Sequence, residues 1–303
     1  MSNIIGIGSS VYDTLMTVDA FPPEDTKMMA TSTKIMAGGP VATGIVASVK
    51  LGVSAKYMGC LGDDVFGNYM YEDFARWGVG TDCIVRKSGV VSFHSVVMLN
   101  TVKSTRTCVW NKGTIPEITP EELNYDQIKQ AKILHLDGHQ LTAAIAGAKF
   151  ARQHGVKVSL DAGGVYPNIE QLLPYVDYLI PSEEFALKIT GADSAEKAAE
   201  ILFNKYHPEF VVITQGKRGG IIYDGELRTY PIYDGPSIDS NGAGDVFHGA
   251  FIAGKIKGFS NYGCCCFASA VSGLKCGKVG AREGTPTFEE TMQFLNKIGV
   301  TIQ

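Results

Sequence analysis

Residues 239–254 read DSNGAGDVFHGAFIAG, a glycine-rich turn that runs into an apolar helix. The segment Gly242-Ala243-Gly244 has only small side chains, so a ligand can approach the main chain closely. The first amides of a helix have no intrahelical partner and carry partial positive charge. The turn therefore predicts an anion site at the start of the helix, with Asp245 beside it.

A carboxylate at that position predicts proton transfer. Asp245 can accept the proton of an attacking hydroxyl, and a positioned base contributes roughly 10²–10⁴-fold to a rate. The free amides would stabilise the charge of a phosphoryl group in transfer. We therefore expect phosphoryl transfer to an alcohol. The alternative is that Asp245 only stabilises the helix dipole, by about 0.3–1 kcal/mol, and that the glycines only form a turn.

Strand-like and helix-like segments alternate on both sides of this stretch. Short apolar runs predict strands over 4–8, 56–60, 133–136, 156–160, 178–180 and 210–214. Longer amphipathic runs predict helices over 40–50, 67–77, 142–154, 184–190, 194–206, 244–255 and 262–276. This alternation predicts an α/β fold with a mainly parallel sheet between two helical layers, where ligands bind at the carboxyl ends of the strands.

Two stretches break the alternation. Residues 12–18 and 26–35 read as two strands around a polar turn, and 92–100 and 106–110 read as another pair. They predict a small antiparallel sheet outside the main one, a lid that can close over a ligand. Ordinary edge strands are the alternative.

The lid segments would span about residues 11–36 and 90–113 of a single catalytic domain, 1–303, because no interdomain linker is evident. Pairing of two lid sheets would give a homodimer.

Composition excludes several classes of protein. The net charge of -4 offers no basic surface for nucleic acid or anionic lipid. No apolar run reaches the roughly 18 residues of a membrane span, and no signal peptide is evident, so we expect a cytoplasmic protein. The seven cysteines lack zinc spacing, and Cys264, Cys265 and Cys266 are adjacent. They are expected to be buried thiols in a reducing compartment.

Residues 239–251 resemble the second signature of the ribokinase-like, pfkB-type carbohydrate kinases, and the family's order of motifs is kept from Ile4 to Gly284-Thr285-Pro286. The resemblance implies a three-layer α/β/α sandwich with an antiparallel lid. It also implies an ATP-dependent sugar kinase with Asp245 as the catalytic base. Gly242, Ala243 and Gly244 would form its anion hole.

The family's first signature resembles Gly38-Gly39-Pro40-Val41-Ala42-Thr43. Gly38 and Gly39 would let sugar hydroxyls reach main-chain amides, and Pro40 suits a first helical turn. Thr43 stands where the family usually has Asn, so a shorter hydroxyl replaces an amide there. Asp13 resembles the acidic residue that holds two sugar hydroxyls, although a solvated turn aspartate is the alternative.

Arg106 resembles an arginine that reaches from the lid in ketohexokinase-like members. It could hold an anionic group of the substrate or cover the transferred phosphate, or it could be solvated. Asn111 and Lys112 are weaker candidates for the same rim. The motifs look most like those of sulfofructose kinase and its relatives, with ketohexokinase and fructokinase close. That likeness implies transfer to the 1-hydroxyl of a ketose with an anionic sixth carbon.

The nucleotide site is expected beyond the strand at 210–214. Thr214 and Gly216 lie where the family borders the nucleotide, and Lys217 could meet phosphate. By resemblance, Ala270, Lys275 and Cys276 would lie on the helix that lines the adenine pocket, although core packing explains this helix equally well. Ser182 would also contribute to this side.

The resemblance implies two cations. Magnesium accompanies ATP, and Glu183 could contact one of its waters, although the family's usual Asn is Ser182 here. Some members use potassium near the anion hole, at places that correspond to Asp239 and residues 280–284. Arg282 could replace that ion, so potassium stays open.

Four alternatives stay open. A ribokinase of the same fold would phosphorylate ribose instead of a ketose. A nucleoside kinase of the same fold would stack a base on aromatic lid residues, for which Trp110 and Phe93 are the candidates. A non-catalytic sugar-binding regulatory protein could keep the fold, although the intact Asp245 argues against it. Gly6 and Gly8 after the first strand hint at a nicotinamide-dependent oxidoreductase, but the third glycine of that motif is missing.

Overall fold

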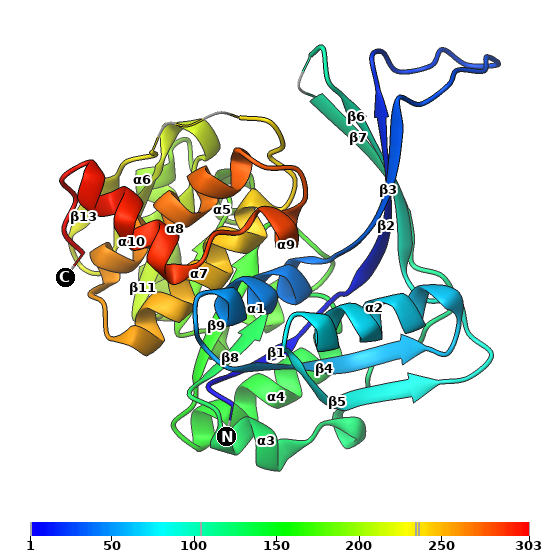
Figure 1. Ribbon diagram of the computed structural model, residues 1–303. Helices are drawn as coiled ribbons and strands as arrows, with labels where there is room; N and C mark the ends of the chain where they lie inside the picture. Colours follow the sequence, from blue (N-terminus) through cyan, green and yellow to red (C-terminus); the bar gives the residue numbers. More distant parts are fainter. Residues whose placement is uncertain (1, 104, 234, 236, 303) are drawn as a thin grey trace.

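A nine-stranded sheet runs through the molecule with helices on both faces (Figure 1). The computed structural model describes residues 2–103, 105–233, 235 and 237–302. The strand order is β13-β12-β11-β10-β9-β8-β1-β4-β5, parallel except for β12 and β13 at one edge. The strands are β1 (Ile4–Ile7), β4 (Ala55–Gly62), β5 (Gly80–Lys87), β8 (Ile133–Leu136), β9 (Lys157–Ala162), β10 (Tyr178–Pro181), β11 (Phe210–Thr214), β12 (Gly220–Tyr223) and β13 (Leu227–Tyr230).

Two separate apolar cores cover the two faces of this sheet. The helices of one face are α1 (Pro40–Lys50), α2 (Val65–Arg76), α7 (Ala243–Lys257), α8 (Asn261–Cys276) and α10 (Phe288–Lys297). Those of the other are α3 (Tyr125–Gln130), α4 (Leu141–Gln153), α5 (Glu183–Thr190) and α6 (Ala195–Tyr206). Consecutive residues of one strand, such as Ile4 and Ile5, enter opposite cores, so the central strands are mainly apolar on both faces. The expected three-layer α/β/α sandwich is confirmed.

The predicted strands and helices of the sandwich all form, with ends within two residues of those expected. The sequence analysis missed β5, β12, β13, α3, α10 and the short α9 (Ala281–Gly284). The edge strand β5 mixes exposed charged residues with half-buried ones, which hides its apolar pattern. Cys264, Cys265 and Cys266 are buried free thiols in α8, as expected. No helix in the described part of the chain is both long and apolar enough to cross a bilayer.

A four-stranded sheet rises from the sandwich as a lid (Figure 1). Its strands are β3 (Ser32–Gly38), β2 (Val11–Val18), β6 (His94–Asn100) and β7 (Thr105–Asn111), in that order across the sheet. The prediction of a purely antiparallel lid is wrong at its centre, because β2 and β6 are parallel. Both strands leave the sandwich in the same direction and lie side by side, while β3 and β7 return. Ser104, in the predicted turn, lies outside the described residues.

The helices differ in whether a side chain caps their N-terminus. The side chains of Asp64, Ser182, Ser194, Ser260 and Thr287 cap α2, α5, α6, α8 and α10. By contrast, α1 and α7 begin after Gly39 (φ 97°) and Gly242 (φ 70°) with no side-chain cap. In α7, amides of the first turn therefore stay open to a ligand, whereas in α1 Pro40 has no N–H and the Val41 amide donates to Asp137 Oδ2.

Candidate active site

Two pockets meet at the first turn of α7. One contains Asp13, Gly38, Gly39, Thr43, Gly242 and Asp245, residues predicted for the sugar and for catalysis. The other contains Thr214, Gly216, Lys217, Ala243 and Gly244, residues predicted for the nucleotide and the anion hole. Asp245 and Gly242 thus face one pocket, while Ala243 and Gly244 face the other.

The lid contributes Asp13 to the sugar side. Its Oδ1 accepts a hydrogen bond from Ser95 Oγ on the neighbouring strand β6, at 2.5 Å. A Cβ on Gly38 would lie 2.1 Å from Asp13 Oδ2, so only glycine leaves room for this carboxylate. Burial raises the pKa of Asp13, although the hydrogen bond from Ser95 and the charge of Arg282 oppose that rise. Sequence reasoning missed Ser95.

Helix α1 contributes Thr43, whose side chain is completely buried beneath the same pocket. Its Oγ1 has no hydrogen-bond partner among the described residues. A buried hydroxyl without a partner costs about 1–3 kcal/mol, so a site that keeps one normally reserves it for a ligand. Position 43, where the family usually has Asn, therefore still offers a polar group in this chain.

Asp245 lies next to the exposed amides of its own helix. Its Oδ2 is 3.6 Å from the place that a Cβ would take on Gly242. The Ala243 amide turns back to the Ser240 carbonyl at 3.2 Å, and no such backbone bond engages the amides of Gly242, Gly244 and Asp245 in the described part of the chain. The free donors at this site therefore include these three amides.

The environment of Asp245 makes it a stronger base than an ordinary aspartate. Burial and the negative charges of Asp161 and Asp137 raise its pKa to about 7, against the opposing charges of His248 and Arg106. A base with a pKa near neutrality combines a high deprotonated fraction with a strong affinity for the proton.

Three further buried side chains stand behind Asp245, and the sequence analysis singled out none of them. His248, one turn along α7, places Nε2 3.1 Å from Oδ1 of Asp161 at the end of β9. Burial alone would raise the pKa of Asp161, but the charge and hydrogen bond of His248 outweigh it and lower that pKa. Asp137, at the end of β8, accepts hydrogen bonds from the amides of Ser9 and Val41.

The nucleotide side is a groove of about 630 Å³ between the ends of β11 and β13 and helices α7 and α8. Thr214, Gly216 and Lys217 line it, as the sequence predicts. Cys276 also lines it, as expected for the helix at the adenine pocket. Its other apolar and small lining residues were not predicted from the sequence: Tyr230, Ile232, Tyr233, Phe247, Ser269, Ser272 and Gly273. An aromatic and small-residue wall of this kind suits a flat heterocycle.

Three predicted nucleotide contacts lie elsewhere. Ala270 is fully buried in the core, and its neighbours on α8 line the groove instead. Lys275 is also fully buried, with its ammonium on the main chain of the loop before α7. Ser182 caps α5 through the Phe185 amide. Helical phase decides these outcomes, because adjacent helix residues point in different directions.

The lid arginine reaches toward the nucleotide side. Arg106 lies on the same face of the lid as Asp13, and its Nη1 is 3.4 Å from Oγ of Ser240, which borders the nucleotide groove. Asn111 is exposed at the end of β7, and its Oδ1 accepts from the Gly113 amide. It does not line the pocket that contains Asp13 and Asp245.

The predicted magnesium contact has other partners. The carboxylate of Glu183 accepts from Gln215 Nε2 at 2.8 Å and forms an ion pair with Arg218. No group of three or more acidic, histidine or cysteine side chains that could hold a metal occurs within residues 2–103, 105–233, 235 and 237–302. This donor set fits a magnesium ion that is held mainly by nucleotide phosphates and water.

A model of the pfkB family of carbohydrate kinases matches residues 1–288. The chain belongs to this family. The kinase is thus an ATP-dependent phosphotransferase that acts on a carbohydrate. It is 28% identical over 301 residues to a ribokinase of Haemophilus influenzae, with 95% of this chain and 97% of the relative covered. It is 23% identical over 289 residues to a ketohexokinase of Mus musculus, with 91% and 97% covered.

Solved structures agree with this assignment of the kinase. The ribokinase of Arabidopsis thaliana, complexed with ribose and ATP, superposes with a TM-score of 0.86. It is 25% identical in sequence, and the match covers 97% of this chain and 99% of that one. The ribokinase-like fold expected from the sequence is confirmed.

Proposed function

We propose that the kinase transfers the γ-phosphoryl group of ATP to the 1-hydroxyl of a ketose, with Asp245 as the base. The observation that carries this proposal is the junction of two pockets at the start of α7. A sugar hydroxyl on the Asp13 side would meet a phosphoryl group on the Gly244 side, with Asp245 at the boundary.

The reaction would follow from that geometry. The Asp245 carboxylate takes the hydroxyl proton while the sugar oxygen bonds to the γ-phosphorus. The bond from that phosphorus to the bridging oxygen breaks, and ADP leaves with the electron pair. The amides of Gly244 and Asp245 donate to the phosphoryl oxygens, whose charge they stabilise. Arg106, above them on the lid, adds a positive charge.

ATP would occupy the groove with its base against Tyr233 and Phe247 and its phosphates toward Gly244. Lys217 lines the same groove and is exposed, so its ammonium can reach a phosphate. Magnesium would neutralise the charge of the β- and γ-phosphates. Glu183 remains a candidate contact only through water, because its carboxylate is already paired with Arg218.

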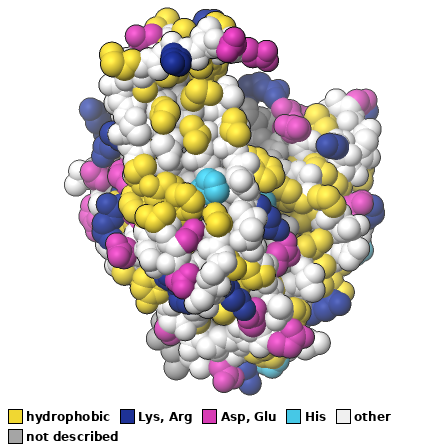
Figure 2. Space-filling model, turned by 90° about the vertical axis from the view of Figure 1, so that its right-hand side faces the viewer, with side chains coloured by type: hydrophobic (Ala, Val, Ile, Leu, Met, Phe, Trp, Pro, Cys, Tyr) yellow, Lys and Arg dark blue, Asp and Glu magenta, His cyan; other side chains and the backbone are white. Residues whose placement is uncertain are grey.

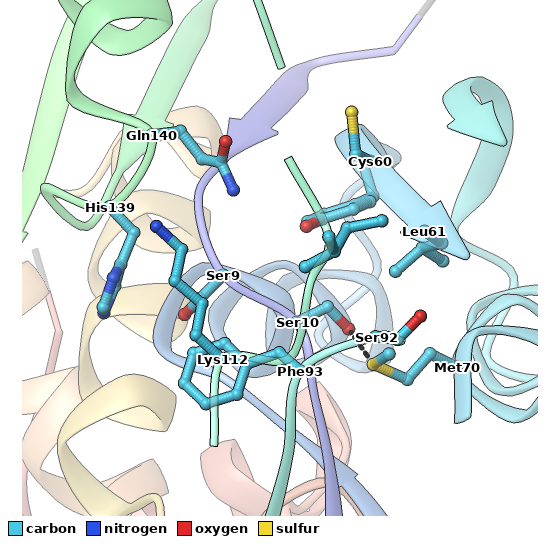
Figure 3. A pocket seen from close by; sticks show the side chains of 12 residues that line it. Ser9, Ser10, Cys60, Leu61, Met70, Ser92, Phe93, Lys112, His139 and Gln140 are labelled. Carbon is cyan, nitrogen blue, oxygen red and sulfur yellow. Dashed lines mark hydrogen bonds between the residues drawn. The ribbon is translucent and has the colours of Figure 1, made fainter. Parts of the chain in front are cut away.

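A ketose with an anionic end is supported by a smaller pocket at the base of the lid (Figure 3). Ser9 and Ser10 line it after β1, and Lys112 and His139 lie together on one side of it. Asp137 connects this pocket to the sugar side, since it binds the amides of both Ser9 and Val41. The end of the sugar remote from the reacting hydroxyl would lie toward Lys112.

One observation favours a nucleoside kinase as the second candidate. Phe93 and Trp110 lie with ring centroids 5.7 Å apart, as a wall on the lid. By register, Trp110 lies opposite Ser95 and on the same face as Asp13, and it is 65% exposed. A base could stack on this wall.

The lid also supports the proposed homodimer. Its outer face carries an apolar row across all four strands, with Ile35, Val96 and Val109 in register with Thr14. All three apolar side chains are exposed, and hydrophobic side chains gather on the lid at the top of Figure 2. A second lid packed here would bury this row.

An ATP-consumption screen tests the substrate. Ketoses, aldoses, sugar acids, sulfosugars and nucleosides are compared at equal concentration, and the product's phosphate position is read by NMR. We expect the highest kcat/KM for a ketose with an anionic sixth carbon and a product phosphorylated on the 1-hydroxyl. A preference for ribose or for a nucleoside would contradict the proposal.

A further inference from the structure

Lys275, at the end of α8, is a completely buried lysine that contacts no pocket. Its Nζ donates to the main-chain carbonyls of Asp239 at 2.6 Å and Asn241 at 2.5 Å. It also lies 3.9 Å from Oδ2 of Asp239. The two carbonyls thus accept two of the three ammonium donors, and the Asp239 carboxylate adds a charge nearby without a direct hydrogen bond.

The oxygens belong to the loop that ends at Gly242, where α7 begins. Asp239 anchors this loop, because its Oδ1 accepts from the Asn241 amide and its Oδ2 from the Gly280 amide, both at 2.8 Å. The amides of Ile238 and Asp239 bind the carbonyl of Cys276. The ammonium therefore stands at the centre of the loop that aims the anion hole.

A buried ammonium costs several kcal/mol unless its partners are well placed. Two carbonyls and a carboxylate that converge on one point form a cage for a small monovalent cation, and Lys275 already fills it. The sequence left open whether Arg282 takes the place of potassium. Arg282 binds Asp73 Oδ2 at 2.5 Å and the carbonyl of Gly38 at 2.8 Å, on the sugar side.

We propose that Lys275 is a positioning residue that acts as a tethered monovalent cation: its ammonium holds the 239–242 loop, and hence the Gly244 and Asp245 amides, without a free ion. A potassium ion does not fit the same oxygens while the lysine is there. This inference rests on the proposed role of the α7 amides.

The test compares the wild-type kinase with Lys275→Ala in potassium chloride, ammonium chloride and tetramethylammonium chloride at equal ionic strength. Wild-type turnover should change by less than about twofold among the three salts. Lys275→Ala should lose about 10²–10³-fold in kcat, the effect of a lost anion-hole donor. Its KM for the sugar should stay within about threefold, because the sugar contacts remain. Ammonium should restore about tenfold or more, since it fits the vacated cage, whereas tetramethylammonium should not.

A thermal-shift series keeps the test independent of the substrate. Ammonium should raise the Tm of Lys275→Ala and leave that of the wild type unchanged. Lys275→Met, which fills the space without a charge, should lose turnover and respond to no salt. Lys255→Met is the matched control, because Lys255 lies in the last turn of α7, where its Nζ donates to Asn261 Oδ1 and packs over the rings of Tyr178 and Phe210. It should keep wild-type turnover.

Several outcomes would overturn the inference. One is a wild-type kinase that needs added potassium. Another is a folded Lys275→Ala variant with near-normal kcat. A third is a Lys275→Ala variant whose turnover and Tm do not change with ammonium, which would mean that Lys275 contributes only to packing. If the wild type phosphorylated none of the sugars, the substrate proposal would fail. The Tm series would still test the proposed role of Lys275.

Discussion

His248 Nε2 lies 3.1 Å from Asp161 Oδ1, one helical turn along α7 from Asp245. The pair keeps a carboxylate charged in the interior, close enough to raise the pKa of Asp245. Asp245 and His248 share one face of α7, so a single helix connects the base to the buried pair that tunes it.

Asp161→Asn is expected to move the acid limb of the pH–rate profile to lower pH. Asp245 works only when deprotonated, and its pKa of about 7 is raised in part by the charge of Asp161. Without that charge the pKa falls, so activity appears at lower pH. The measurement is kcat/KM from pH 5 to 9. Asp193→Asn, at an exposed carboxylate, is the control and should leave the limb in place. A limb that stays or rises in Asp161→Asn refutes the coupling.

Asp245→Asn is expected to abolish nearly all turnover, by about 10³-fold or more, since the base is lost. It should also stabilise the fold above pH 7. The folded pKa of about 7 exceeds the usual value of 3.8, so the stability associated with this group is present at low pH and lost as pH rises between these values. Calorimetry at pH 5 and 8 should show a clearly larger Tm gain for the variant over the wild type at pH 8 than at pH 5. Near-normal turnover would refute the assignment of the base.

Thr43→Val is expected to raise the KM for the sugar by roughly 5–10-fold, the value of one hydrogen bond. The fold should not lose stability, because the hydroxyl of Thr43 has no partner in the described protein and valine has the same shape. Thr43→Ser keeps the hydroxyl and should keep a low KM. A Thr43→Val variant with unchanged KM but a lower Tm would show that the hydroxyl serves the fold instead.

Arg106→Ala is expected to lower kcat by about 10²-fold for neutral and anionic sugars alike, because Arg106 points toward Ser240 at the phosphoryl end. Arg106→Lys should recover only part of the lost kcat, since lysine lacks the planar guanidinium group. Steady-state kinetics on fructose and an anionic ketose distinguish a role of Arg106 at the phosphoryl group from recognition of the sugar's charge. A KM increase confined to the anionic sugar would show that Arg106 reads the sugar's charge. Arg228→Ala, whose partner is Asp224, is the control.

Val109→Asp is expected to convert a homodimer into monomers, because Val109 is 64% exposed on the outer lid face. Burial of a carboxylate between two lids would cost several kcal/mol. Light scattering gives the mass. Val65→Asp, equally exposed at the start of α2, should leave the mass unchanged. A wild-type monomer would remove the dimer from the proposal.

The sequence alone was enough to predict the sandwich and the start of α7. Alternating apolar runs have few ways to be buried, and a glycine turn before a helix exposes amides wherever it occurs. Asp13, Gly38, Thr43 and Asp245 were therefore found as separate motifs. The resemblance to the family also predicted Thr214 and Gly216 at the nucleotide groove.

Only the tertiary structure decided the direction of side chains and the pairing of distant segments. It joined β2 to β6 in parallel, turned Ala270 into the core, and placed the Lys275 ammonium on Asp239, 36 residues away. It also brought Asp161 to His248. These contacts depend on helical phase and on which strands become neighbours, and neither is written in a local run of residues.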